Sequence, residues 1–271
     1  MASLGQSQRK APGLQATMPL DVTDLRSFYA SPLGGVVRRV LGDVVAARWD
    51  TLVGQSVLGL GYALPYLEGR RDEAMRMMAF FPATLGAVSW PAQGASSASL
   101  VETDLLPLPD ASIDRALLVH CLEATENPRL ALEEIWRVLT PQGRMIVVVP
   151  SRRGIWARVD GTPFGQGQPF SRSQLRDMLR ETLFSPTYVA EALYTPPLAR
   201  TSFLRLARAF ERIGVGLSLP GAGVIVAEAS KQLYRPVLAR RGLQIAGPRL
   251  AHPRLLPSAG SGPAGRLIPK R

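Results

Sequence analysis

The spacing of apolar residues along the chain predicts a helical beginning. Between residues 25 and 45 apolar side chains recur at intervals of three and four, the period of an amphipathic helix. Pro32 and the pair Gly34 and Gly35 interrupt this stretch, so we expect two helices rather than one. Such a segment ahead of the first strand can cover one side of a sheet.

Short apolar runs and helical patterns then alternate. We expect strands at 56–61, 85–90, from 100 onward, at 114–119 and at 144–149, with helices at 66–81 and 130–139. Strands separated by helices indicate βαβ units and a largely parallel sheet. Because such a sheet binds ligands beyond the carboxyl ends of its strands, functional residues are expected directly after each strand.

The pattern changes after residue 150. We expect a loop at 151–170, a helix at 171–183, a strand within 184–193, a helix at 203–213 and a final antiparallel strand at 223–229. About seven strands with helices between them predict an α/β fold.

Composition and cysteine content narrow the class of protein. Hydrophobic residues make up 46% and charged residues 20%, as in a globular domain. The longest apolar runs are far too short to span a bilayer, and the first residues lack the apolar core of a secretory signal, so we expect a cytoplasmic protein. A single cysteine excludes an intramolecular disulfide and a cysteine-based zinc site, and no metal is expected.

The net charge of +11 is concentrated at one end. Residues 231–271 hold nine basic and no acidic side chains, so the remainder is nearly neutral. This end is rich in Pro and Gly and poor in aromatic residues, which predicts a basic disordered tail at 235–271; residues 1–20 read as a flexible leader. A basic tail can attract anionic surfaces, but without interleaved aromatic residues a specific nucleic-acid role is not favoured.

Three motifs follow one another in the middle of the chain. They are ETDLLPLPDASID at 102–114, LVHCLE at 118–123 and EIWRVLTPQG at 134–143. They resemble the segments D-A-x-x-LPF-P-D-x-S-F-D, h-x-LEH and E-h-x-RVLKPGG of the type-11 branch of the class I S-adenosylmethionine (SAM) methyltransferases. The resemblance implies a Rossmann-like, seven-stranded, mostly parallel sheet, SAM as cofactor, and methyl transfer to a small-molecule or protein acceptor that the sequence does not identify.

The resemblance also implies roles for single residues. Glu102 matches the acidic residue that contacts the adenine amino group, and a carboxylate suits this task because it accepts hydrogen bonds. Thr103 follows it at the rim of the adenine pocket. His120 falls where the family lines the methionine end of SAM or the substrate entrance. A general-base role for His120 and a purely structural one both stay open.

The first motif departs from the family. Residues 57–65 read VLGLGYALP where the family has VLDLGCGTG, so Gly61 is kept while Gly59 replaces an acidic residue and Ala63 a glycine. Glycines in this loop permit positive φ and a close approach of the backbone to the ligand. We expect these residues and Tyr62 to line an altered cofactor loop, in which Tyr62 either stacks on the cofactor or fills its space.

A second departure concerns the ribose. Where the family has an acid after its second strand, the predicted strand is followed by Ser89-Trp90-Pro91. A carboxylate that binds the ribose hydroxyls is worth about 1–3 kcal/mol, so its loss predicts weakened SAM binding.

The loop after the fifth predicted strand carries a second candidate site. It contains Arg152, Arg153, Trp156, Arg158 and Phe164. In this family the segment lies near the acceptor, so these residues are expected to contact the substrate or a partner protein. A solvated loop with one packed Trp is the alternative.

These observations divide the chain as follows. A methyltransferase-like domain is predicted at 21–234, with N-terminal helices at 21–50, a cofactor half at 51–150 and an acceptor or partner half at 151–234. The leading hypothesis is a SAM-dependent methyltransferase with weakened cofactor binding. The alternative is a catalytically inactive, methyltransferase-like module that binds a partner protein.

Overall fold

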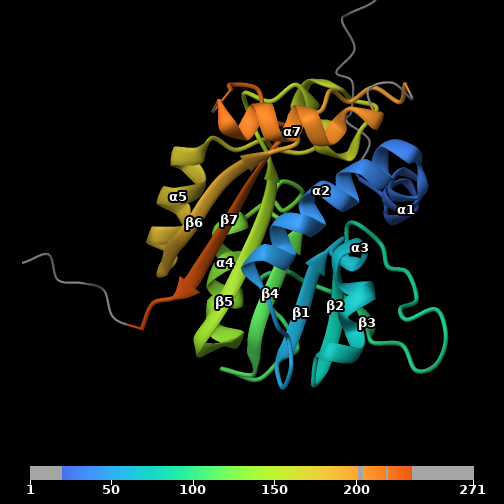
Figure 1. The fold of residues 1–271 in the computed structure, drawn as a ribbon. Coiled ribbons are helices and arrows are strands. Elements are labelled where there is room, and N and C mark those ends of the chain that lie inside the picture. Colours follow the sequence, from blue (N-terminus) through green and yellow to red (C-terminus); the bar gives the residue numbers. More distant parts are fainter. Residues whose placement is uncertain (1–19, 201–203, 218, 234–271) are drawn as a thin grey trace, which may run out of the picture. The chain divides into compact units, whose positions relative to one another are not determined.

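The computed structural model describes residues 20–200, 204–217 and 219–233 (Figure 1). The predicted leader, except for Leu20, and the predicted basic tail lie outside the described residues. The strands are β1 (Ser56–Gly61), β2 (Arg76–Pro82), β3 (Ala98–Val101), β4 (Ile113–Val119), β5 (Leu139–Pro150), β6 (Phe184–Ala192) and β7 (Val224–Lys231). They form one sheet in the order β3-β2-β1-β4-β5-β7-β6, parallel except for β7, which is antiparallel to both neighbours. The seven-stranded, mostly parallel sheet predicted from the sequence is confirmed.

Helices cover both faces of this sheet (Figure 1). They are α1 (Val22–Ala30), α2 (Pro32–Arg48), α3 (Leu64–Leu67), α4 (Pro128–Val138), α5 (Arg172–Glu181) and α7 (Ala207–Gly216), with the 3₁₀ turns η1 (Glu68–Glu73), η2 (Trp156–Arg158) and η3 (Pro163–Gly165). Apolar side chains of α1, α2 and α3 pack with one set of alternate strand residues, and those of α4 and α5 pack with the other set. The period-two alternation of side chains along each strand thus separates two hydrophobic layers.

The two N-terminal helices meet at a single residue. Ser31 ends α1, where its backbone N–H donates to the Phe28 carbonyl, and caps α2, where its hydroxyl accepts from the N–H of Gly34. Pro32 then occupies the first turn of α2, where a missing N–H costs nothing. A side chain at Gly34 would collide with the Phe28 carbonyl, so the glycine permits the tight corner. The predicted break between two helices is therefore present.

The region between β1 and β3 differs from the sequence prediction. Residues 66–81 are not a helix: α3 ends at Leu67, a 3₁₀ turn follows, and residues 76–82 form β2. Residues 85–90, predicted as a strand, lie in the loop between β2 and β3. The segment RMMAFFP pairs with β1 and β3 and is mostly buried. A strand in the middle of a parallel sheet reads as a continuous apolar run, which periodicity alone does not distinguish from a buried helix.

An ion pair between Arg48 and Glu228 links α2 to the sheet. Glu228 of β7 is fully buried, and its Oε2 accepts hydrogen bonds from Nε and Nη2 of Arg48 at the end of α2. Arg144 lies 3.7 Å from the other carboxylate oxygen. Because a buried carboxylate needs such partners, Arg48 stabilises the packing of α2 on the sheet although its own side chain is 32% exposed.

Candidate functional site

The loop after β1 is shaped by Gly61. This residue has φ of 84°, and a side chain here would collide with the carbonyl of Val119 at the end of β4. The next N–H, of Tyr62, donates to the same carbonyl at 2.7 Å. Gly59 lies inside β1, where a Cβ would meet the side chains of Leu67 and Ala63 at 2.7 and 3.0 Å. The two glycines therefore serve close packing of β1 against β4 and α3.

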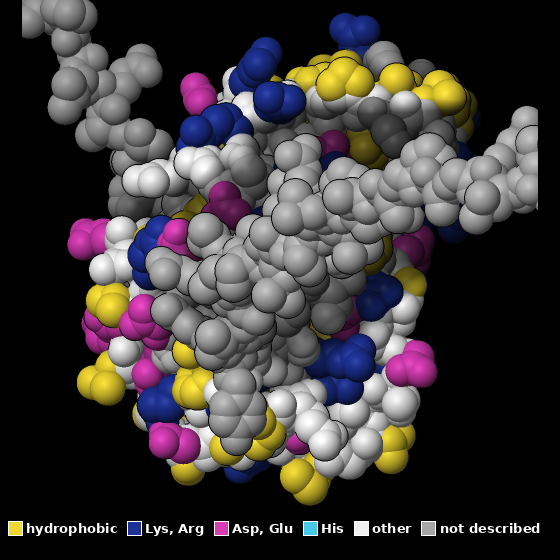
Figure 2. All heavy atoms as spheres, turned by 90° about the vertical axis from the view of Figure 1, so that its left-hand side faces the viewer, with side chains coloured by type: hydrophobic (Ala, Val, Ile, Leu, Met, Phe, Trp, Pro, Cys, Tyr) yellow, Lys and Arg dark blue, Asp and Glu magenta, His cyan; other side chains and the backbone are white. Residues whose placement is uncertain are grey.

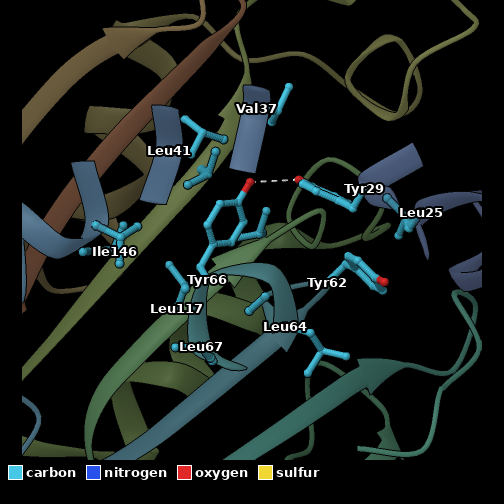
Figure 3. Close-up of a cluster of buried hydrophobic side chains, with 14 of the residues drawn as sticks. Leu25, Tyr29, Val37, Leu41, Tyr62, Leu64, Tyr66, Leu67, Leu117 and Ile146 are labelled. Atoms are coloured by element: carbon cyan, nitrogen blue, oxygen red, sulfur yellow. Dashed lines mark hydrogen bonds between the residues drawn. The ribbon is translucent and has the colours of Figure 1, made fainter. Parts of the chain in front are cut away.

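A cluster of buried tyrosines lies directly beyond this loop. The ring of Tyr62 stacks on that of Tyr29 from α1, with centroids 5.5 Å apart. The Tyr29 hydroxyl lies 3.0 Å from the hydroxyl of Tyr66 on α3 (Figure 3). It also lies 3.0 Å from Nε2 of His120. Burial raises the pKa of Tyr29 and of Tyr66, so both phenols stay protonated across the neutral range. We call Tyr29, Tyr62, Tyr66 and His120 the tyrosine–histidine cluster.

His120 is the centre of this cluster. It follows β4 with φ of 52°, unusual for a residue with a side chain, and it is fully buried. Its Nδ1 lies 3.2 Å from Oε1 of Glu123, at an angle outside hydrogen-bond geometry; neither carboxylate oxygen of Glu123 has a hydrogen-bond partner among the described residues. The ring of Phe164 lies 4.7 Å from the imidazole. His120 is thus enclosed by aromatic rings and a buried carboxylate.

An open hollow lies beside the cluster, at the carboxyl ends of β2 and β3. Its volume is about 280 Å³, and it is lined by Pro82, Ala83, Thr84, Val101, Glu102, Thr103, Asp104 and residues 124–127. Glu102 is exposed in this hollow. A second hollow of about 340 Å³ shares Thr84, Ala124, Thr125 and Glu126 and continues to Glu123 and residues 166–168. The two hollows share these residues and form one groove with both polar and apolar residues in its wall, which we call the Glu102 groove.

Tyr29 and Tyr62 also belong to the wall of a third hollow. It has a volume of about 650 Å³ and includes Arg26, Arg38 and Trp90. Trp90 is buried, with the guanidinium of Arg71 5.7 Å from its ring centroid. The loop after β1 therefore lines this hollow through Tyr62, Leu64 and Pro65, while the side chains of Tyr29 and Tyr62 are themselves buried and fill the space directly beyond Gly61.

Comparison with known proteins agrees with this geometry. Residues 59–147, from β1 to β5, match the sequence model of a family described as a methyltransferase domain. Many solved structures of SAM-dependent methyltransferases share the fold. Residues 59–147 are thus similar to a methyltransferase domain, and the chain has the Rossmann-like methyltransferase fold.

Individual structures similar to this chain have diverse descriptions. A SAM-dependent methyltransferase from Thermotoga maritima, a possible histamine N-methyltransferase, is 16% identical with a TM-score of 0.55, covering 78% of this chain and 96% of its own. A putative methyltransferase in complex with the Haloferax volcanii Trm112 activator is 18% identical with a TM-score of 0.53, covering 78% and 98%. The [4+2]-cyclase SpnF is 21% identical with a TM-score of 0.50, covering 72% and 80%. At these identities the likeness concerns the fold, which does not decide the reaction. A search among curated proteins gives no match.

The carboxylate that would bind the ribose hydroxyls is absent, as predicted. The end of the second strand, where it is absent, is not the position that the sequence predicted. The second strand ends at Pro82, followed by Ala83 and Thr84, whereas residues 89–91 lie in the loop that follows. The predicted position is therefore wrong, because the observed strand at 76–82 precedes the predicted strand at 85–90. Pro, Ala and Thr also supply no carboxylate at the true strand end.

The loop after β5 divides into a buried and an exposed part. Trp156 and Phe164 are each 1% exposed, and Nε1 of Trp156 donates to the Thr195 carbonyl at 2.8 Å. These two aromatic residues are therefore packed into the core and do not form the contact surface expected of them. Arg152, Arg153 and Arg158 are exposed. Their role toward a substrate or partner stays a prediction.

Several residues of the site were not found from the sequence. Tyr29 belongs to the apolar face of α1, and nothing in its spacing distinguishes it from a core residue. Tyr66 begins the predicted helix at 66–81, whereas it lies in the short helix α3. Glu123 belongs to a recognised motif, but no sequence signal indicates its burial beside His120. Among the described residues no group of three or more His, Cys, Asp and Glu side chains is placed to hold a metal ion, and no helix is long and apolar enough to cross a membrane.

Proposed function

We propose that the chain is a SAM-dependent methyltransferase that binds SAM weakly, through the adenosine end first. The observation that carries this proposal is the open Glu102 groove at the carboxyl ends of β2 and β3. Parallel sheets of this kind bind ligands beyond the carboxyl ends of their strands. An exposed carboxylate at this point can accept a hydrogen bond from an exocyclic amino group of adenine.

The residues present fit one end of SAM and not the other. Glu102 and Thr103 suit the adenine, and the groove has room for a ring system. The methionine end would meet the tyrosine–histidine cluster, which fills the space beyond Gly61. Displacing Tyr29 breaks its contacts with Tyr66 and His120, and this cost reduces affinity. SAM supplies an electrophilic methyl group when bound. The tyrosine–histidine cluster is closed, so no residue is assigned to the methyl acceptor.

The second candidate is a catalytically inactive module that binds a partner protein. Burial of Tyr62 and Trp90 favours it, because both side chains occupy space near the cofactor loop. The missing ribose carboxylate favours it as well. A protein partner is described for the Trm112-bound structural neighbour, which makes this use of the fold a reasonable comparison.

Isothermal titration with SAM and S-adenosylhomocysteine tests the proposal. We expect weak binding to the unchanged chain and a loss of about tenfold or more for Glu102→Ala, because a hydrogen bond to a charged group is removed. Glu133→Ala is the matched control, since it removes an exposed carboxylate from α4, away from the groove, and should change nothing.

A second variant tests the closed end directly. Tyr29→Ala is expected to tighten binding of S-adenosylhomocysteine, because in this variant no tyrosine ring has to be displaced from the space beyond Gly61. The free energy of unfolding should fall by about 3–5 kcal/mol. Thermal unfolding of each variant shows that the folded protein is being titrated. If neither the unchanged chain nor folded Tyr29→Ala binds at millimolar ligand, the cofactor proposal fails and the partner-binding candidate takes its place.

A further inference from the structure

Helix α7 differs from an ordinary core-facing helix in which of its residues are buried. Its buried residues are the small ones, Ala207 and Gly214. Four large apolar residues of the helix and its immediate flanks are exposed: Leu206, Ile213, Val215 and Leu217 are 54%, 53%, 60% and 70% exposed, whereas Phe210 and Leu204 are partly buried. Leu219, just beyond the helix, is 40% exposed. A helix in water normally turns its large apolar side chains toward the core.

The inward face of α7 explains why it holds this orientation. A Cβ at Gly214 would collide with the ring of Tyr194, so only glycine lets the helix lie against that ring. Glu211 also points inward: its carboxylate accepts from the backbone N–H groups of Leu193 and Thr195 and from the Thr195 hydroxyl, at 3.0–3.1 Å. Rotating α7 to bury its leucines would break these hydrogen bonds and push Gly214 out. The exposed apolar face is therefore fixed by packing.

Charge on the same helix has one sign. Arg205, Arg208 and Arg212 are exposed, whereas Glu211, the sole acidic residue of the sequence between 198 and 220, is engaged inside. In Figure 2 hydrophobic side chains gather at the top of the molecule, where Figure 1 places α7, with Lys and Arg side chains beside them. We call Leu206, Ile213, Leu217, Leu219, Arg205, Arg208 and Arg212 the α7 surface. Val215 lies on the other side of the helix, where it lines a hollow of about 450 Å³ together with Arg208, Arg212, Asp43 and Glu191.

We propose that the α7 surface docks onto an anionic lipid bilayer. An amphipathic helix that carries apolar side chains next to a row of arginines lies in the plane of a membrane interface, with its apolar side in the acyl boundary and its cations among the headgroups. Each arginine near an anionic leaflet adds to the attraction, and the net charge of +11 acts in the same direction. A folded protein partner would have to supply acceptors for several arginines around an apolar centre, whereas an anionic bilayer supplies both without special fit.

The surface is tested with a fluorescent reporter. Cys121 is buried and burial raises its pKa to about 12, so Ile213→Cys provides a single reactive thiol for an environment-sensitive nitrobenzoxadiazole label. With vesicles that contain phosphatidylglycerol we expect brighter, blue-shifted emission from this label, and little change with phosphatidylcholine alone. Met75→Cys, which labels a 69% exposed residue just before β2, is the control and should stay dark with both.

Sedimentation of the full chain with vesicles measures its affinity for the bilayer. Leu206→Asp together with Leu217→Asp is expected to weaken binding by at least about tenfold, because apolar burial is lost. Arg208→Gln and Arg212→Gln should each weaken it by about fivefold. Met75→Asp is the matched control and should bind like the unchanged chain. Circular dichroism confirms that each variant is folded.

The basic segment 235–271 could bind anionic vesicles without the α7 surface, and the experiment distinguishes this outcome. If this segment alone adsorbs the chain, sedimentation on anionic vesicles survives the leucine changes and the Ile213→Cys label does not respond, which overturns the proposal. A label that responds without vesicles as protein concentration rises indicates contact with a second copy, and this also overturns it. Equal binding to phosphatidylcholine overturns the assignment to an anionic surface.

Discussion

Replacing Gly61 with alanine should lower the free energy of unfolding by about 3 kcal/mol or more. Residue 61 has φ of 84°, a conformation that costs a residue with a Cβ about 1–2 kcal/mol. In addition, the new Cβ would collide with the Val119 carbonyl, so β1 and β4 must separate at their carboxyl ends. Strain in backbone pairing adds to the conformational cost. Urea unfolding followed by circular dichroism measures the loss.

The control separates the two causes. Gly54→Ala places a Cβ at φ of 74°, with no heavy atom within 4 Å. It should lose the conformational part alone, about 1–2 kcal/mol. Equal losses for the two variants would mean that Gly61 is kept for its φ angle and that the contact with Val119 is unimportant.

Replacing Arg48 with methionine should destabilise the fold by about 3 kcal/mol. Methionine keeps much of the apolar stem but removes the donors to Glu228, which is fully buried on β7. A buried carboxylate that loses its charged partner costs about 3–5 kcal/mol, and the Thr187 hydroxyl, which donates to Oε2 at 3.3 Å, and Arg144 at 3.7 Å offset part of it. Chemical unfolding of the single variant measures the loss.

Two comparisons identify the origin of that loss. Adding Glu228→Gln to Arg48→Met should restore part of the stability, because the uncompensated charge is gone. Arg129→Met breaks an ion pair with Glu181 in which both side chains are about half exposed, so less than about 1 kcal/mol should be lost. A loss for Arg48→Met no larger than for Arg129→Met would show that the buried pair does not stabilise α2 on the sheet.

The sequence predicts the sheet well where local signals are strong. The breaks around Pro32, the strand at 56–61 and the motif-bearing stretch from β4 to β5 each combine apolar runs with capping residues or recognisable motifs, and the corresponding elements are present. Between residues 66 and 90 the signals conflict. The apolar run of β2 is too short and too uniform to reveal its period, and the buried Leu85 and Trp90 resemble a strand although they fill a loop.

The candidate site is less predictable because its parts come from distant segments. Glu102 follows β3 and lies in an open groove, as its place after a strand indicates. The burial of His120 depends on Tyr29 and Phe164, which are 91 and 44 residues away along the chain. Periodicity describes which face of an element is apolar. It does not describe which aromatic ring of another element will meet that face, and so the closed cluster could not be derived from motifs.

The location of Tyr29 and Phe164 has an evolutionary consequence. Both lie outside residues 59–147, the stretch that matches the methyltransferase family. Whether the space beyond Gly61 is open or closed is therefore decided by segments that are free to diverge while every family motif stays the same. Two chains with identical motifs can then differ in their ability to hold a cofactor, and a lineage can lose or regain that ability through substitutions in one N-terminal helix and one loop.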